Sequence, residues 1–253
     1  MTLLAQRPTE ARALDNLCFY EVEDLIVLQD PRGDFERLVR TWRANRRRLR
    51  ARIIAATEAQ LAWELERSSR GSPLHRAAFL RLSAWRMACL FVFLETGWRV
   101  PRLHLLDEVL PVREGRRLRR ALALPPAERC RRVVRRVPRA IRELEAMLAR
   151  DGAPTRLDVP ESIAAKASTN PRESAFLARR ELVLEWLPAV FARYGVTDLK
   201  GVELLEHAPT ARALLLALEP RATAASVTAL SREVRALGRG LGLASRRAVS
   251  WFF

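Results

Sequence analysis

Apolar positions between residues 74 and 94 recur at the spacing of a helix and then extend around it. One face is apolar every three or four residues: Leu74, Ala78, Leu82, Trp85, Cys89 and Phe93. From Met87 to Leu94 every position is apolar. A helix that is apolar on every side is buried on every side. The pattern therefore predicts the central helix of a bundle, with Ser72 as its N-cap and Pro73 in its first turn.

We expect this helix not to cross a membrane. Its uninterrupted apolar stretch, residues 87–94, is far shorter than the roughly 20 residues that a membrane-spanning helix needs. The first residues, MTLLAQRPTEARALD, lack the apolar core of a signal peptide. The three cysteines, Cys18, Cys89 and Cys130, are scattered and fit neither a disulfide framework nor a zinc site. These features predict a cytoplasmic protein with no membrane partner.

The same spacing predicts helices along most of the chain. A long one begins at Phe35, with Asp34 as its N-cap, and ends near Ser68. Pro125-Pro126 and Pro138 divide the section 112–150, because proline interrupts helical hydrogen bonding. The remaining predicted helices are 101–111, 161–168, 172–194 after Asn170-Pro171, 197–207, 210–218 and 226–237, followed by a flexible end at Gly238–Gly242.

One segment alone has the pattern of a strand. Residues 18–29 carry aromatic and β-branched side chains in partial alternation, and a turn at Asp30–Gly33 follows. The predicted fold is therefore mainly α, an antiparallel helical bundle with one short strand-like segment near the N-terminus and a second, smaller helical section. Gly152, Pro154 and Pro160 make residues 151–160 the best linker. We expect the bundle to span 1–150 and the smaller section 155–253.

The net charge of +16 indicates that the protein binds polyanionic partners. Nearly all the positive charge is arginine, because Lys166 and Lys200 are the only lysines. A GC-rich coding sequence is the alternative explanation for this bias. GC-rich coding accounts for the exchange of Lys for Arg. That exchange leaves the net charge unchanged, so GC-rich coding does not account for the excess of positive charge.

Arginine is concentrated in two segments, 37–52 and 113–142. We predict that their arginine faces bind nucleic acid, RNA rather than DNA, or a nucleotide. The predicted contact residues are Arg43, Arg46, Arg47, Arg50, Arg132, Arg135, Arg136 and Arg139. The apolar tail Trp251-Phe252-Phe253 must pack on the protein or bind a protein partner.

Candidate catalytic groups are few. Glu21 and Glu23 stand two apart on the strand-like segment, so they share a face and could hold a divalent metal with Asp24 and Asp30 nearby. An exposed strand face explains the same residues, and we favour it. No HExxH, phosphate-binding loop or GxGxxG motif is present. We expect no metal site, no cofactor and no nucleotidyl transfer.

Two pairs match the Arg-x4–6-His pattern of HEPN ribonucleases, which are all-helical. They are Arg70 with His75 and Arg99 with His104. In that family a polar residue usually follows the arginine, whereas Gly71 and Val100 follow here. Solvated turn residues are the simpler interpretation of both pairs.

Two stretches together resemble the helical C-terminal part of the minimal nucleotidyltransferases. They are DLIVLQDPRGDFERL (24–38) and CLFVFLETGWRVPRLHLLDEVLP (89–111), within residues 20–112. Those enzymes place an Asp-x-Asp metal pair after a Gly-Ser turn, whereas Pro73 and Leu74 follow Gly71-Ser72 here. The resemblance therefore implies the helical part without the catalytic sheet, or a degenerate homologue. The alternatives are a HEPN-type ribonuclease and a structural subunit of a nucleoprotein assembly.

Overall fold

The computed structural model describes residues 33–96, 106, 109–149, 156–196, 198–219, 222–246 and 252. Every regular element in these ranges is a helix, which confirms the mainly α prediction. The strand-like segment 18–29 lies outside the described residues. The helices are α3 (Asp34–Ser69), α4 (Pro73–Thr96), α6 (Val112–Leu122), α7 (Ala127–Val134), α8 (Val137–Leu148), α9 (Glu161–Thr169), α10 (Pro171–Glu181), α11 (Leu187–Arg193), α12 (Pro209–Leu218) and α13 (Ala224–Gly240), with a π-helix η2 (Leu182–Trp186) and a 3-10 helix η3 (Leu199–His207).

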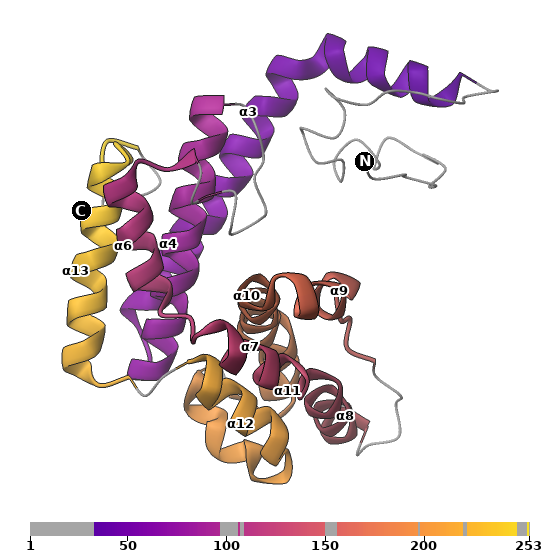
Figure 1. The fold of residues 1–253 in the computed structure, drawn as a ribbon, viewed down its shortest axis with the longest axis vertical. Coiled ribbons are helices and arrows are strands. Elements are labelled where there is room, and N and C mark those ends of the chain that lie inside the picture. The colour runs from indigo at the N-terminus through magenta and orange to yellow at the C-terminus, as the bar shows by residue number, and fades with distance from the viewer. Residues whose placement is uncertain are drawn as a thin grey trace.

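Helix α4 is the centre of one layer of the molecule. Helices α3, α6 and α13 run alongside it and pack against it (Figure 1). Trp85, Met87 and Phe93 are buried on it, as the apolar pattern predicted. Among the described helices, α4 alone is long and apolar enough to cross a membrane. However, 78% of its apolar window is buried inside the structure, which is typical of a core helix.

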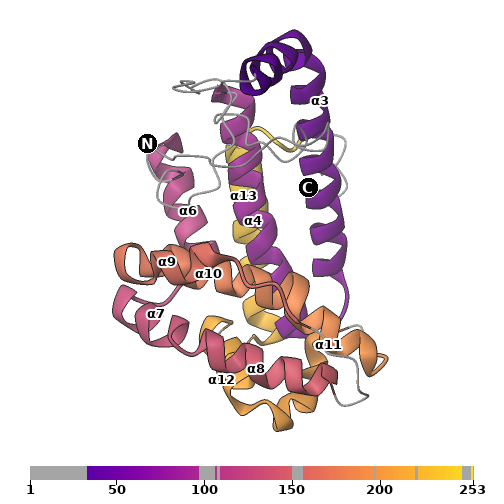
Figure 2. The same ribbon diagram turned by 90° about the vertical axis from the view of Figure 1, so that its right-hand side faces the viewer.

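Helices α7 to α12 form a second group, which lies crosswise to the first (Figure 2). Its core is built around Trp186, Leu182 and Leu214. Helices from both sides of residues 150–155 pack together, since α10 contacts α7, α12 contacts α8, and α13 contacts α4 and α6. The predicted linker centre itself, 151–155, lies outside the described residues. Each core therefore draws on both halves of the chain.

Several helix starts follow the local sequence. The Ser72 side chain accepts a hydrogen bond from the His75 amide at 3.3 Å, and Pro73 is the first residue of α4. The Asn170 side chain accepts from the Glu173 amide at 3.3 Å and caps α10. Pro138 lies in the first turn of α8, where its missing N–H costs nothing. The predicted helix starts at Ser72 and Asn170 are confirmed, and the interruption predicted near Pro138 lies just before it, between the end of α7 at Val134 and the start of α8 at Val137.

Two predictions about helix ends are wrong, and one correctly predicted helix has an irregular turn within it. Asp34 is the first residue of α3 and not its N-cap, which is Gly33 in a left-handed conformation with φ of 65°. The helix predicted over 172–194 contains the π-helix η2, because Pro188 has no N–H to donate back to Leu184. The glycine-rich end predicted to be flexible is helical through Gly240, and Gly238 is buried.

A buried ionic group joins the two layers. The Arg179 guanidinium donates to the carbonyls of Leu122 and Leu218, the last residues of α6 and α12. Its Nε lies 2.9 Å from Glu219 Oε1, and Arg81 from α4 donates to the other carboxylate oxygen at 2.6 Å. One arginine therefore satisfies two helix ends, whose final carbonyls have no partner within the helix.

Candidate polyanion-binding surfaces

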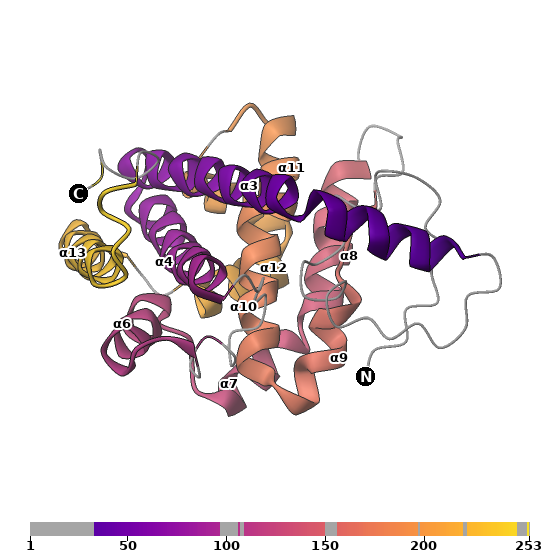
Figure 3. The ribbon, with the colours of Figure 1, turned by 90° about the horizontal axis from the view of Figure 1, so that it is seen from above.

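The first half of α3 is a surface of arginines, here named the α3 basic segment (residues 36–52). It extends past the end of α4 and away from the other helices (Figures 1 and 3). Its exposed arginines are Arg37, Arg40, Arg43, Arg46, Arg47, Arg48 and Arg52. Glu36 is the only acid in this range, and it pairs with Arg40 at 3.1 Å. The segment therefore carries a large excess of positive charge toward solvent.

Arg50 differs from its neighbours on the α3 basic segment, because it is half-buried. Its Nη2 donates to the Leu94 carbonyl at 2.8 Å, and its guanidinium lies 5.9 Å from the centre of the Phe93 ring. These contacts hold α3 against the last turns of α4. Arg50, one of the four contact residues predicted on this helix, therefore has a structural role as well.

A second surface lies at the junction of α7 and α8, and we name it the α7–α8 basic surface. Arg132, Arg135, Arg136 and Arg139 are all exposed there, as predicted contact residues would have to be. Residues 135 and 136 form a short turn between two helices, so the four residues keep near-helical spacing and lie along one side. Arg139 Nε also lies 3.4 Å from Glu143 Oε1.

Acidic side chains gather elsewhere. Glu185, Glu203 and Glu206 are exposed in the segment that follows α10, where Arg193 and Lys200 are the only Arg and Lys residues between 181 and 210. The general replacement of Lys by Arg would not separate acids from bases in this way. The separation therefore favours a surface that attracts anions over a simple coding bias.

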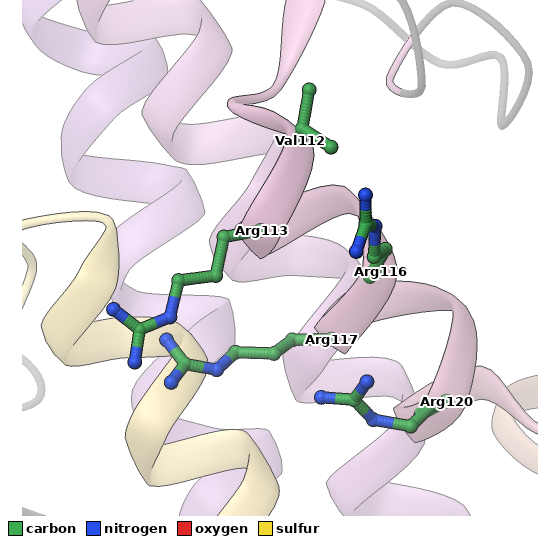
Figure 4. Close-up of a pocket in the computed structure, with 5 residues that line it drawn as sticks. All are labelled: Val112, Arg113, Arg116, Arg117 and Arg120. Carbon is green, nitrogen blue, oxygen red and sulfur yellow. The ribbon is translucent and has the colours of Figure 1, made fainter.

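Helix α6 lies in the arginine-rich segment 113–142, but its arginines were not among the predicted contact residues. A cavity of about 490 Å³ is lined by Val112 and by four arginines, Arg113, Arg116, Arg117 and Arg120 (Figure 4). The spacing of three and four residues was visible in the sequence and places them on one side of a helix. The contacts of Arg117 and Arg120 with α13 could not be seen in the sequence, because α13 lies far along the chain.

His75 is buried and is not a solvated turn residue, so that interpretation is wrong for it. Its Nδ1 lies 3.5 Å from Asp198 Oδ1, and Asp198 also accepts hydrogen bonds from the Ser72 amide (2.6 Å) and the Ser72 hydroxyl (2.8 Å). Burial lowers the pKa of His75, and the Asp198 charge opposes that shift. Because the Ser72 hydroxyl is bonded to Asp198, these residues do not form a Ser-His relay.

Arg70, the proposed ribonuclease partner of His75, is exposed and lies 3.0 Å from Glu66. Arg99 and His104 lie outside the described residues. The same holds for Glu21, Glu23, Asp24 and Asp30. Within the part of the chain that the structure describes, no three His, Cys, Asp or Glu residues gather closely enough to hold a metal ion.

The remaining singled-out residues pack within the protein. Cys130 is buried, its thiol donates to the Pro125 carbonyl at 3.2 Å, and burial raises its pKa. Phe252 is buried in the core around α4, and the Arg235 guanidinium lies 4.8 Å from its ring centre. Trp251 and Phe253 lie outside the described residues, so a protein partner for the tail stays a prediction.

No family model, no curated protein and no solved structure matches this chain. The resemblance to the minimal nucleotidyltransferases therefore rests on the residues quoted above. Of these, 34–38 and 89–96 are helical, while 24–32 and 97–105 lie outside the described residues.

Proposed function

We propose that this protein binds nucleic acid through phosphate contacts made by the α3 basic segment and the α7–α8 basic surface. The observation that carries the proposal is the exposure of the arginines there, which outnumber the acidic residues on the same helices. Guanidinium groups match the oxygens of a phosphate and stay charged at all physiological pH values. Binding of this kind releases counterions from the nucleic acid and is steeply dependent on salt.

The contacts would position nucleic acid without reading its sequence. Trp63 and Tyr194 are exposed aromatic side chains that lie on other parts of the protein, and no aromatic residue occurs between positions 127 and 148, which include the α7–α8 basic surface. Without an aromatic platform, bases have no stacking partner there, and phosphate contacts carry no sequence information. Such contacts suit RNA and DNA alike, and the preference for RNA comes from the two family resemblances.

The proposal includes no catalysis. From the resemblance to the nucleotidyltransferases, the proposal takes only a helical part that contacts nucleotides and lacks the transferase core. We propose that the protein acts in the cytoplasm. No observation on the described residues favours the ribonuclease alternative, because His75 is 6% exposed and held by Asp198. A cleavage assay without metal tests that alternative directly.

Fluorescence anisotropy with a labelled RNA at low salt tests the proposal. The variant Arg132→Glu, Arg135→Glu, Arg136→Glu should bind at least about tenfold more weakly, since three attractive charges become repulsive. Arg139 is left in place because it contacts Glu143.

The control reverses three exposed arginines on other elements: Arg156→Glu, Arg212→Glu and Arg232→Glu. This control changes the net charge by the same amount. It should lose much less affinity, because its three arginines lie outside the proposed surfaces. Absence of binding by the wild type, or equal losses in the two variants, contradicts the proposed α7–α8 surface.

A further inference from the structure

The cavity on α6 is separate from both basic surfaces. Arg113, Arg116, Arg117 and Arg120 stand three or four residues apart, so their side chains project from one side of the helix. Figure 4 shows Arg113 and Arg117 extending side by side toward α13, with Arg116 and Arg120 along the same cavity. Its volume of about 490 Å³ falls within the range of small-ligand sites.

Helix α13 fixes two of these arginines. Arg120 donates from Nε and Nη2 to one oxygen of Glu233, at 3.1 and 2.6 Å. Arg117 Nη1 lies 3.3 Å from Glu114 Oε1 and donates to the Ala236 carbonyl at 3.3 Å. The side chain of Arg117 is 16% exposed, so its position is set before any ligand arrives.

The close approach of α13 depends on Gly240. A Cβ atom at this position would lie 2.4 Å from Glu114 Oε1 and 3.2 Å from Arg117 Nη1. Any side chain would therefore displace the Glu114–Arg117 pair. The glycine lets a charged pair from α6 sit directly against the backbone of α13, and one member of the pair, Arg117, lines the cavity.

Charge at the cavity is incompletely neutralised by the protein. Glu114 and Glu233 offset Arg117 and Arg120, whereas Arg113 and Arg116 are exposed and take part in no ion pair among the described residues. Two positive charges are left over, and they lie three residues apart, where like charges repel.

The position of Arg113 adds a second cost. It lies in the first turn of α6, where the helix dipole disfavours a cation, and Glu114 in the same turn offsets part of this effect. Pro111 provides no side-chain cap, so the first amides of α6 have no acceptor from the N-cap side chain. A bound anion would be favoured at this end of α6, because it would reduce the repulsion between Arg113 and Arg116.

We propose that the α6 cavity binds a phosphomonoester group. At neutral pH this group carries about two negative charges, which match the two charges left over at Arg113 and Arg116. Its oxygens suit guanidinium forks and free helix amides. Val112 is the only apolar residue of the lining, so the rest of the ligand would be weakly held. The group occurs at a phosphorylated RNA end and on a free nucleotide, and the former source rests on the proposed function.

Two measurements on the full chain test this inference. The first compares, by anisotropy, one short RNA with a 5′-phosphate and the same RNA with a 5′-hydroxyl. The second compares, by thermal melting at constant ionic strength, uridine 5′-monophosphate with uridine. If the site exists, the phosphorylated RNA should bind about tenfold more tightly than the 5′-hydroxyl RNA, or uridine 5′-monophosphate should raise Tm while uridine does not, or both.

The variant Arg113→Gln, Arg116→Gln should lose these effects and, without ligand, melt no lower than the wild type. The control Arg156→Gln, Arg212→Gln removes the same charge elsewhere and should keep them. If only the RNA experiment shows a preference for the 5′-phosphate, the cavity binds RNA ends. If only the melting experiment shows a rise in Tm with the monophosphate, the cavity binds nucleotides.

If neither RNA binds, but the monophosphate raises the Tm of the wild type and not that of the Arg113 and Arg116 variant, the phosphate site is supported and the proposed nucleic-acid function is contradicted. The inference is overturned if the wild type shows neither effect, or if the effects survive in the Arg113 and Arg116 variant.

Discussion

At the scale of single residues, Arg179 shows how a buried charge can hold an α-helical protein together. Burial lowers its pKa, and the Glu219 carboxylate opposes that shift. The sequence offered no sign of this role, because Arg179 looks like any of the many arginines on helix faces. Its partners Leu122, Leu218 and Glu219 lie far from it along the chain. Only the packing of the helices brings them together.

Replacing Arg179 with Met should lower the free energy of unfolding by about 3–5 kcal/mol, because Glu219 would keep only Arg81 and two helix ends would lose their donor. Chemical denaturation measures this loss. The matched control is Arg40→Met, since Arg40 pairs with Glu36 while both are largely exposed, and it should cost under about 1 kcal/mol. Similar small losses in both variants would refute the role of Arg179.

His75 should make stability depend on pH. Its pKa is lower in the folded protein than the ordinary value of 6.5, because burial disfavours the charged ring. As the pH falls through about 6.5, the unfolded chain binds a proton that the folded protein resists, so stability is lost toward acid. Above that value both states are neutral and the contribution is intact.

The measurement is the change in Tm between about pH 7.5 and pH 5.5 for the wild type and for His75→Gln. The wild type should lose more over this interval, since Gln does not titrate. Asp198 and Arg67 also act on His75, and both remain in the variant. Parallel curves for the two proteins would show that His75 is not the group responsible.

At the scale of elements, local signals predicted helix starts better than helix packing. Ser72 and Asn170 cap their helices because a hydroxyl or amide oxygen satisfies an orphan amide within a few residues, and this needs no tertiary structure. By contrast, the cap of α12 comes from another helix. Glu143 of α8 accepts hydrogen bonds from the Thr210 amide at 2.7 Å and the Ala211 amide at 3.2 Å. No spacing rule could have revealed it.

The α12 cap should contribute measurably to stability. Burial acts to raise the pKa of Glu143, but hydrogen bonds from Thr210 and Ala211 outweigh it and lower the pKa. Glu143→Ala should cost about 1–2 kcal/mol through loss of the cap, and Glu143→Gln should cost less, because the amide oxygen still accepts. Urea denaturation at neutral pH compares them. An alanine variant as stable as the wild type would contradict this account.

At the scale of the whole molecule, composition predicted a basic helical protein but not where its charge is used. The arginine totals were plain in the sequence, and the exposed set on α3, α7 and α8 agrees with the faces predicted there. The sequence could not distinguish Arg50, which donates to the Leu94 carbonyl, from Arg43, which lies about two turns earlier on the same helix. Nor could it show that α13 places Glu233 beside Arg120. Both distinctions depend on contacts between distant parts of the chain.

Salt dependence is the property of the whole molecule that follows from this separation of charge. The logarithm of the RNA association constant should fall linearly with the logarithm of salt concentration, with a slope of about −0.7 for each phosphate contacted on a single strand. The variant Arg132→Glu, Arg135→Glu, Arg136→Glu should have a slope that is shallower by about two, because it contacts fewer phosphates. Titrations from about 50 to 200 mM salt measure both slopes. A wild-type affinity that is insensitive to salt would mean that phosphate neutralisation does not drive binding, and that the arginine surfaces serve another purpose.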